Sequence, residues 1–239
     1  MSEPIPLERN LNWWWYKLKN GYLNHILKKY SPTDIGLNIL EIGPGRGNNF
    51  SVLKNFGNLS VLEVEEHFIE QLIQNQQITA DRIFRKFNDI SIKNKFDIII
   101  ALDVLEHIED TESFIENIFN VLNIDGLLII SVPAYKSLWS DHDIDLKHIK
   151  RYNWKLLNEE ISPFFNIKKR YGMNYLLLPL RYIQIKLFKN LSSTQENSKF
   201  LNLLFLIISK FEVFALSFNI NPKFGLSLFT VAQKKVSNS

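Results

Sequence analysis

The chain has 239 residues, of which 46% are hydrophobic, and its 28 basic and 25 acidic side chains leave a net charge of +3. This size and apolar content fit a single domain, and the balanced charge gives no argument for a nucleic-acid partner. The absence of cysteine excludes disulfides, thiolate nucleophiles and cysteine-based zinc sites. Because the polar N-terminal segment does not resemble a signal peptide, we expect a cytoplasmic protein.

The first predicted element is a helix over residues 11–30, where apolar side chains recur at steps of three and four before Ser31-Pro32. Strands and helices then alternate. The predicted strands cover residues 38–42, 59–65, 83–87, 96–102 and 127–132, and the predicted helices begin near residue 48 and cover residues 66–77 and 111–122. This alternation predicts a parallel sheet with right-handed crossovers.

The pattern changes after the fifth strand. A polar and aromatic connection spans residues 134–152, followed by a predicted helix (153–160), a strand (165–171), a helical region (173–219) and a last strand (225–234). Ligands in open α/β sheets bind beyond the carboxyl ends of the strands, so residues 134–152 are a candidate wall of a binding site. We therefore expect one domain, with an N-terminal aromatic cap (1–30), a core (36–172), a helical insertion (173–220) and a closing strand (225–235).

Three alternating glycines follow the first predicted strand, in the stretch EIGPGRGNNF at residues 41–50. Gly43, Gly45 and Gly47 tolerate positive φ at a tight turn and let a ligand approach the main chain. Two ligand classes use such a turn, a dinucleotide or S-adenosylmethionine. The remaining interpretation is a tight turn without a ligand.

Two observations favour the methyl donor over a dinucleotide. The dinucleotide fingerprint has glycine or alanine where this chain has Asn48. The carboxylate of Glu41 would repel a pyrophosphate but would tolerate a sulfonium and an ammonium. Glu65, at the end of the second predicted strand, is placed to accept hydrogen bonds from ribose hydroxyls.

The motifs LEIGPGRG and FDIIIALDVLEHIED, with Asp125-Gly126 before residues 127–133, resemble those of the class I S-adenosylmethionine-dependent methyltransferases. The resemblance implies a Rossmann-like α/β fold with a seven-stranded, mostly parallel sheet of order 3-2-1-4-5-7-6 and an antiparallel last strand. It also implies S-adenosylmethionine as cofactor and S-adenosylhomocysteine as product. The N-terminal aromatic run 13–16 and the HD…H…RY loop are similar to a branch encoded among cell-surface polysaccharide or lipid-modifying genes.

The resemblance also implies roles for individual residues around the cofactor. Gly43, Gly45 and Gly47 would line its methionine and ribose portions, Glu41 would lie near the amino-acid moiety, and Glu65 would hold the ribose. Asp89 would accept from the adenine amine, and Asp103 would face the methionine end.

Methyl transfer depends mainly on positioning the acceptor, and a base is needed only where the acceptor must lose a proton. His148 and His142 are the candidate bases or substrate contacts because histidine titrates near neutral pH. The further candidate substrate-binding residues are Tyr135, Trp139, Asp143, Arg151, Tyr152 and Trp13. The alternative for each is a structural role, in ordering the loop or packing on the core. No metal site is predicted, because two histidines six residues apart have no standard ligand spacing.

We therefore expect methyl transfer to an oxygen or nitrogen of a small or lipid-linked acceptor, with or without a sugar. The alternatives are a non-catalytic S-adenosylmethionine-binding partner subunit and a nicotinamide-dependent oxidoreductase. Residues 173–220 have three candidate roles: substrate cover, homodimer interface and peripheral membrane contact. Apolar residues and the lysines 186, 189, 199 and 210 are interspersed there. A spanning helix is not expected, because the apolar run breaks at Ser209-Lys210.

Overall fold

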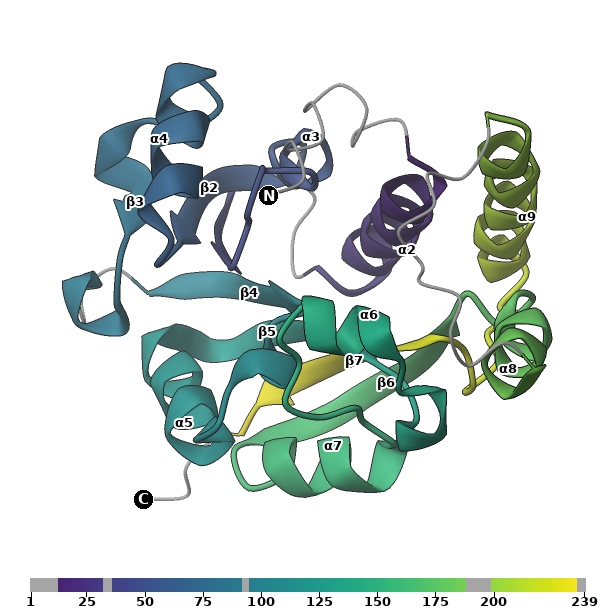
Figure 1. The fold of residues 1–239 in the computed structure, drawn as a ribbon. Helices are drawn as coiled ribbons and strands as arrows, with labels where there is room; N and C mark the ends of the chain where they lie inside the picture. The colour runs from purple at the N-terminus through teal and green to yellow at the C-terminus, as the bar shows by residue number, and fades with distance from the viewer. Residues whose placement is uncertain (1–12, 32–35, 92–94, 188–198, 236–239) are drawn as a thin grey trace.

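The computed structural model describes residues 13–31, 36–91, 95–187 and 199–235. These residues build a seven-stranded sheet in the order β3-β2-β1-β4-β5-β7-β6 (Figure 1). The strands are β1 (Leu37–Ile42), β2 (Gly57–Leu62), β3 (Ile83–Phe84), β4 (Phe96–Leu102), β5 (Leu122–Pro133), β6 (Phe165–Met173) and β7 (Ser227–Lys234). Neighbours from β3 to β5 are parallel, and β7 is antiparallel to both β5 and β6. The expected sheet order and antiparallel last strand are confirmed.

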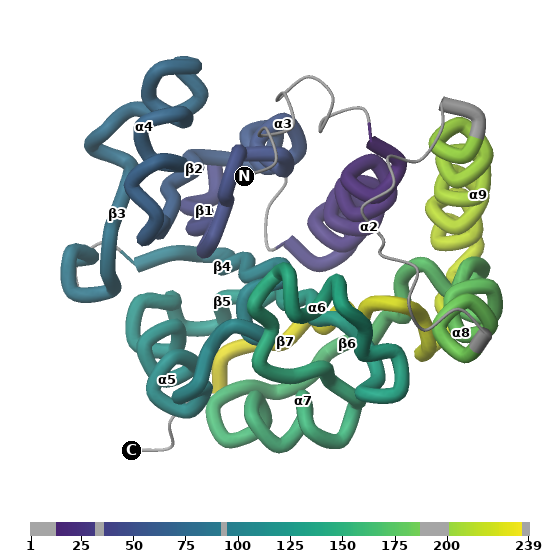
Figure 2. The backbone as a smooth tube through the Cα atoms, in the orientation of Figure 1, coloured from purple at the N-terminus to yellow at the C-terminus, as the bar shows by residue number. Residues whose placement is uncertain are grey.

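Helices cover both faces of the sheet (Figures 1 and 2). They are α2 (Trp14–Tyr30), α3 (Phe50–Leu53), α4 (Glu66–Gln74), α5 (Thr111–Val121), α6 (Asp141–Asp145), α7 (Trp154–Ile161), α8 (Leu178–Leu187) and α9 (Lys199–Ser217). One hydrophobic cluster joins α2, α3, α4 and α9 to the sheet, and a second joins α5 and α7 to the opposite face. Adjacent strand residues therefore point to different clusters, as Ile98 and Ile99 of β4 do.

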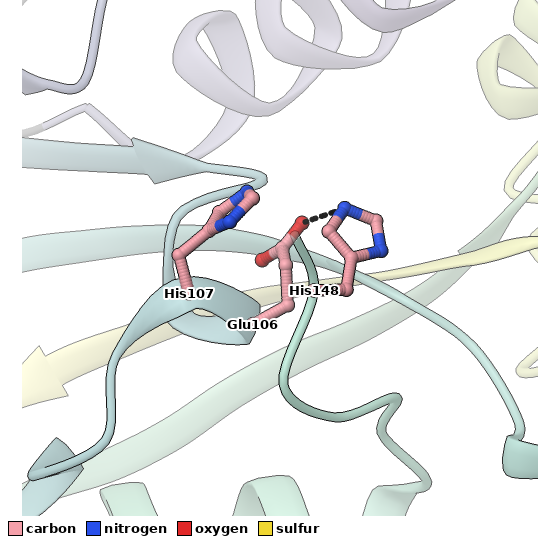
Figure 3. A group of neighbouring side chains, drawn as sticks. All are labelled: Glu106, His107 and His148. Carbon is pink, nitrogen blue, oxygen red and sulfur yellow. Dashed lines mark ion pairs between the residues drawn. The ribbon is translucent and has the colours of Figure 1, made fainter. Parts of the chain in front are cut away.

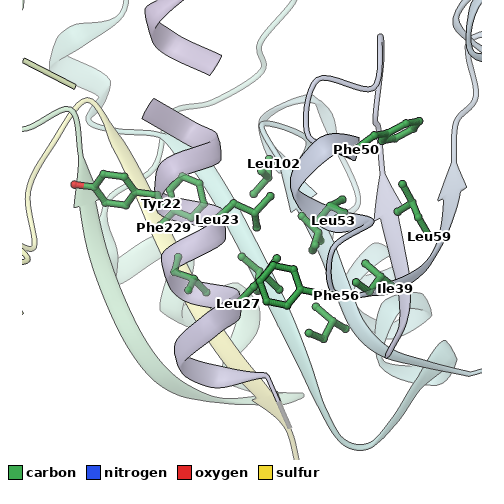
Figure 4. Packing of buried hydrophobic residues seen from close by; sticks show 14 of the residues in the cluster. Tyr22, Leu23, Leu27, Ile39, Phe50, Leu53, Phe56, Leu59, Leu102 and Phe229 are labelled. Atoms are coloured by element: carbon green, nitrogen blue, oxygen red, sulfur yellow. The ribbon is translucent and has the colours of Figure 1, made fainter. Parts of the chain in front are cut away.

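Helix α2 packs the N-terminal part of the chain onto the sheet beside β7 (Figure 4). Leu18, Tyr22 and Ile26, four residues apart, are fully buried on one face of the helix. The Tyr22 ring lies 5.9 Å from the ring of Phe229 in β7. Burying side chains of this size contributes about 1.5–3 kcal/mol each, so α2 is held firmly along the sheet.

Helices α2 and α9 pack side by side at close range. A Cβ at Gly21 of α2 would lie 2.4 Å from a methyl group of Val213, so glycine permits this approach. Glu212 of α9 is fully buried, and it accepts hydrogen bonds from the backbone N–H groups of Asn174 and Leu176, each at 2.8 Å. Its carboxylate thereby ties α9 to the segment that follows β6.

The structure shifts several predicted boundaries. Strand β2 ends at Leu62 instead of residue 65, since Val64 already points to solvent and is 69% exposed. Strand β3 ends at Phe84, and a 3-10 turn begins at Phe87, where the predicted strand was to end. Strand β5 begins at Leu122, five residues earlier than predicted. Within the 134–152 connection lies the short helix α6. Among the described residues, none of the helices combines the length and apolar character that crossing a bilayer requires.

Candidate active site

The glycine turn directly follows β1 and holds three glycines in left-handed conformations. The φ angles of Gly43, Gly45 and Gly47 are 65°, 52° and 73°, a region that side-chain-bearing residues rarely adopt. A Cβ on Gly43 would lie 2.9 Å from Val104, whereas a Cβ on Gly45 would meet no protein atom within 4 Å. The turn therefore leaves open space beside Gly45.

Glu63 is the carboxylate that contacts this turn. It is the first residue after β2, is only 5% exposed, and accepts a 3.0 Å hydrogen bond from the backbone N–H of Gly45. Its other oxygen accepts from the N–H groups of Val64 (2.8 Å) and Glu65 (3.0 Å). These bonds fix the carboxylate at the carboxyl end of β2, beside the open space.

Glu65 does not lie where the sequence analysis expected it. Its side chain is 63% exposed and lies 3.7 Å from His67 at the start of α4. Since β2 ends at Leu62, the residue at the tip of the strand is Glu63, two positions earlier. In the sequence Leu62-Glu63-Val64-Glu65, apolar and acidic residues alternate, so the strand could end before either glutamate. The sequence thus offered Glu63 as a second candidate.

Glu41 is buried beneath the turn. Asn49 donates a 2.5 Å hydrogen bond to one of its carboxylate oxygens, and among the described residues the other oxygen has no partner. Burial raises the pKa of Glu41 from 4.5 to about 7, although the hydrogen bond from Asn49 and the charge of Lys19 oppose the shift. The carboxyl group is therefore poised between its neutral and charged forms near neutral pH.

Asp103 follows β4 and forms an ion pair with Lys19 of α2, with 2.5 Å between the Lys19 Nζ and the carboxylate. Ser131 donates to its other oxygen at 2.8 Å. Burial by itself lowers the pKa of Lys19, but the Asp103 carboxylate outweighs burial and the net shift is upward. Lys19 was not among the predicted site residues, because a lysine within an amphipathic helix gives no sign of which partner it reaches.

Asp89 lies near β3 and stabilises its own turn. Its carboxylate accepts hydrogen bonds from the backbone N–H groups of Arg85 (3.1 Å) and Lys86 (3.2 Å), and the residue is exposed. These contacts explain why the 3-10 turn forms there. They leave the expected adenine contact of Asp89 as a proposal.

In the 134–152 loop, Asp143 is the central residue. It is fully buried and accepts from Arg151 at 2.6 and 3.0 Å, from the N–H of Ser140 at 2.9 Å, and contacts His148 at 2.9 Å. Burial by itself raises the pKa of Asp143, but the hydrogen bonds from His148 and Arg151 outweigh it, so the pKa falls well below its usual range. Asp143 and Arg151 thus hold the loop together as a charged, hydrogen-bonded unit.

Tyr152 anchors the end of this loop. Its ring is fully buried, and its hydroxyl donates to Glu160 at 3.0 Å and lies 3.2 Å from the carbonyl oxygen of Leu105. Burial raises the pKa of Tyr152 far above its usual value. The contacts described for Tyr152 are therefore structural.

His148 and the residues after β4 form a group that the linear spacing did not reveal (Figure 3). The side chain of His148 is 7% exposed, with Nδ1 against Asp143 and Nε2 3.9 Å from an oxygen of Glu106. Burial raises the pKa of Glu106 well above its ordinary value, and burial lowers the pKa of the neighbouring His107. Both ring nitrogens of His148 therefore face carboxylates of the chain itself.

The other predicted contacts have more open positions. His142 lies on α6 at the surface of the loop, and burial lowers the pKa of its ring. Tyr135, Trp139 and Trp13 are half-buried. Tyr135, two residues after β5, adopts a φ of 56°, and Trp13 packs edge-on against Tyr16 at 5.9 Å. These aromatic rings are partly available to a ligand.

The residues at the carboxyl ends of β1, β2 and β4 fit S-adenosylmethionine. The space beside Gly45 admits a ligand close to the main chain, and the carboxylate of Glu63 can accept hydrogen bonds from ribose hydroxyls. The unpartnered oxygen of Glu41 and the carboxylate of Asp103 suit a cationic amino-acid portion. The fold and these residues together are those of a nucleoside-binding site of the methyltransferase class.

Residues 7–169 match the family model described as "Methyltransferase domain". The match covers well over half of the chain, so this chain belongs to that methyltransferase family. Together with the observed sheet order, this identifies a class I S-adenosylmethionine-dependent methyltransferase and counts against the nicotinamide-dependent alternative.

Two curated relatives are similar to parts of the chain. The ubiquinone biosynthesis O-methyltransferase of Rickettsia typhi is 27% identical over 135 residues, covering 50% of this chain and 55% of the relative. The enzyme of the same description from Glaesserella parasuis serovar 5 is 46% identical over 56 residues, 23% of each protein. The chain therefore matches only about a quarter to a half of the length of these relatives.

Solved structures with the same fold include two methyltransferases of low sequence identity. A putative sarcosine dimethylglycine methyltransferase from Galdieria sulphuraria has a TM-score of 0.57 at 14% identity, over 91% of this chain and 86% of that chain. The N-methyltransferase NodS from Bradyrhizobium japonicum WM9, in complex with S-adenosyl-L-homocysteine, has a TM-score of 0.54 at 13% identity, over 98% and 90%. Both likenesses support the fold.

Proposed function

We propose that this methyltransferase transfers a methyl group to a hydroxyl oxygen, or secondarily to an amine nitrogen, of an acceptor with a lipid portion. The support for oxygen is that both curated relatives are named for O-methyl transfer in ubiquinone biosynthesis. The support for a lipid portion is an exposed apolar helix face, described below. A sugar in the acceptor, suggested by the resemblance to polysaccharide-modifying branches, is the less favoured version.

The observation that carries the cofactor site is the hydrogen bond between the Gly45 N–H and Glu63. We propose that Glu63, and not Glu65, holds the ribose hydroxyls, and that Gly43, Gly45 and Gly47 border the ligand. Glu41 and Asp103 would face the amino-acid portion. Lys19, already buried against Asp103 and 5.8 Å from the Trp15 ring, would supply a positive charge for its carboxylate.

When bound, S-adenosylmethionine supplies a methyl group on a sulfonium, and the acceptor oxygen forms the new O–C bond as the S–C bond breaks. The acceptor hydroxyl must also lose its proton. We propose His142 as the proton acceptor of the two histidines, because its residue is exposed while both nitrogens of His148 face carboxylates. Tyr135, Trp139 and Trp13 would line the acceptor path, and Arg151, Asp143 and Tyr152 would hold the loop in shape.

The test of the site compares Glu63→Gln with Glu65→Gln. Removing a charge-assisted hydrogen bond costs about 1.5–3 kcal/mol, so Glu63→Gln should weaken S-adenosylhomocysteine binding by roughly 10- to 100-fold. Glu65→Gln, the same change two residues away on an exposed side chain, should leave the affinity unchanged. Isothermal titration calorimetry measures both, and the opposite ranking would return the ribose role to Glu65.

The acceptor class needs a separate assay. Methyl transfer from labelled S-adenosylmethionine should be followed with hydroxylated aromatic compounds bearing long and short isoprenoid tails, with glycolipids, and with simple amines. Turnover confined to tail-free amines would contradict the proposed acceptor while leaving the cofactor site intact.

The face of α9 that points away from α2 supports contact with a lipid surface. Leu203, Ile207, Phe211 and Phe214 recur on one side of this helix, and Phe218 directly follows its end; all five are more than one-third exposed. We call these five residues the α9 stripe. Exposed apolar stripes of this kind mark docking sites.

Charge favours an anionic membrane over a second copy of the chain as the occupant of the α9 stripe. Within residues 176–187 and 201–224, Lys186, Lys210 and Lys223 are exposed, and the one acidic residue, Glu212, is buried. A second copy would bring like charges together, whereas anionic headgroups would neutralise them. We therefore propose peripheral membrane contact through α9, which places the enzyme where a lipid-linked acceptor is found.

A further inference from the structure

Three side chains with metal-ligating atoms converge beside the carboxyl end of β4. Glu106 and His107 belong to the 3-10 turn Leu105–His107, and His148 comes from the loop after α6. One ligand atom from each of the three lies within 4.8 Å of the others. In Figure 3 the Glu106 carboxylate lies between the two imidazole rings.

Glu106 is the unusual member of this group. It is fully buried, and among the described residues neither carboxylate oxygen has a hydrogen-bond partner. Burying an unpartnered carboxylate is expensive, so such groups are normally paired, protonated or bound to a cation. The Nε2 of His148 lies 3.9 Å from one of its oxygens, which is too long for a direct hydrogen bond.

The orientation of His148 is fixed from its far side. Its Nδ1 lies 2.9 Å from Asp143, and the two hydrogen bonds from Arg151 hold Asp143 in place. A carboxylate only accepts hydrogen bonds, so Nδ1 carries a proton, and Nε2 is the ring nitrogen that faces Glu106. This carboxylate–histidine arrangement is the one that orients metal-binding histidines in proteins.

We propose that Glu106, His107 and His148 bind a divalent transition-metal cation, for which zinc is the best match to two imidazoles and one carboxylate. Ligands about 2.0–2.2 Å from zinc in a tetrahedron lie roughly 3.4 Å apart, so small side-chain shifts close the site. His107 is exposed, which leaves the fourth coordination position accessible from outside.

The location suggests what the metal does, and this step rests on the proposed function. Asp103, at the proposed methionine end of the cofactor, lies three residues before Glu106 in the segment that follows β4. A cation at Glu106 would bind the acceptor oxygen at its open position and lower the pKa of that hydroxyl. The hydroxyl proton then leaves to His142 or water, the oxygen forms the bond to the methyl carbon, and the sulfur keeps the electron pair of the broken S–C bond.

Metal titration of the full chain, stripped with a chelator, tests this site. Zn²⁺ competition with a chromophoric chelator and the visible absorption of bound Co²⁺ should both report one site per chain. His107→Ala and Glu106→Gln should each weaken Zn²⁺ binding at least 100-fold, and Asp143→Asn about 10- to 100-fold through His148. His142→Ala, an exposed histidine of the same loop outside the group, should leave Zn²⁺ affinity unchanged.

His107→Ala keeps the test decisive if Glu106→Gln or Asp143→Asn fails to fold, because His107 is exposed. The metal site would be overturned if Zn²⁺ bound only with a Kd of millimolar or weaker, or if His107→Ala left both Zn²⁺ binding and the Co²⁺ spectrum unchanged. Glu106 would then be a protonated carboxyl group. Titration with S-adenosylhomocysteine runs in parallel. Cofactor binding without metal binding would reject this inference alone, whereas loss of cofactor binding would reject the proposed function.

Discussion

Glu41 makes the site sensitive to pH at the scale of a single residue. A carboxyl whose pKa rises from 4.5 to about 7 keeps a proton in the folded protein that the unfolded chain has already released. Below about pH 4.5 this carboxyl keeps its proton in both states, so its ionisation does not lower the free energy of unfolding. As the pH rises from about 4.5 to about 7, the folded protein loses stability. At 1.36 kcal/mol per pKa unit, the full cost is about 3 kcal/mol.

Glu41→Gln should remove this pH dependence, because glutamine keeps the shape and cannot ionise. The free energy of unfolding of the variant, minus that of the native chain, should increase by about 3 kcal/mol between pH 4.5 and 7.5. Urea denaturation without cofactor measures both proteins. A difference that stays constant over this range would mean that Glu41 ionises normally.

Substitution of Gly45 can distinguish an effect on backbone strain from an effect on ligand binding. Gly45→Ala and Gly36→Ala both place a Cβ at positive φ, and neither Cβ would meet a protein atom within 4 Å. Each should therefore lose about 1–2 kcal/mol of stability. Only Gly45→Ala should also weaken S-adenosylhomocysteine binding, by at least roughly 10-fold, because its methyl group enters the proposed cofactor space. Equal affinities in calorimetry would place the cofactor elsewhere.

The carboxylates show where reasoning from the sequence succeeds and where it stops. The glycine turn was predictable because its residue types answer a local backbone need. The choice between Glu63 and Glu65 depended on where β2 ends, which is set by packing beyond the local pattern. The Glu106–His107–His148 group joins residues that are 41 and 42 positions apart in the chain, and no local sequence pattern indicates that they meet.

At the scale of elements, α2 and α9 form a helix pair that the sequence predicted only in part. The apolar period of α2 was visible, as were helices within residues 173–219. Their mutual packing was not, since it depends on Gly21 facing Val213 and on the buried Glu212. Such tertiary partners follow from the complete fold and not from local periodicity.

Glu212→Ala tests how α9 is held. It would leave the N–H groups of Asn174, which is buried, and Leu176 without this partner, and each buried unsatisfied group costs about 1–3 kcal/mol. We expect a loss of about 3 kcal/mol in the free energy of unfolding, measured by urea denaturation. Glu159→Ala, on an exposed side chain of α7, should change it by less than about 0.5 kcal/mol. A loss below 1 kcal/mol for Glu212→Ala would show that water replaces the carboxylate.

At the scale of the whole molecule, the proposed cofactor site is built on β1, β2 and β4, and the proposed membrane contact on α9; vesicle binding tests the membrane contact. Phe211→Gln with Phe214→Gln should reduce partitioning onto phosphatidylglycerol vesicles by roughly 100-fold, because two large apolar side chains no longer enter the interface. The matched control is Val64→Gln with Ile124→Gln, two exposed apolar residues away from α9, which should bind as the native chain does.

Salt and lipid charge complete this experiment. Binding should weaken in 0.5 M salt, roughly three times the physiological level, and on phosphatidylcholine alone, since headgroup charge contributes. Absence of binding to either lipid, together with a dimer in solution that Phe211→Gln dissociates, would assign the α9 stripe to a second copy of the chain.

The position of β7 bears on how the protein is made. This strand is the last of the seven to be synthesised, yet it lies between β5 and β6 and is the only strand that β6 pairs with among the described residues. Until residues 227–234 have been synthesised, β6 has no strand to pair with, and the backbone groups on one edge of β5 are unpaired. Bare strands recruit strands from other molecules. A polypeptide cut short before Ser227 should therefore accumulate as aggregate, because β6 would lack the strand with which it pairs.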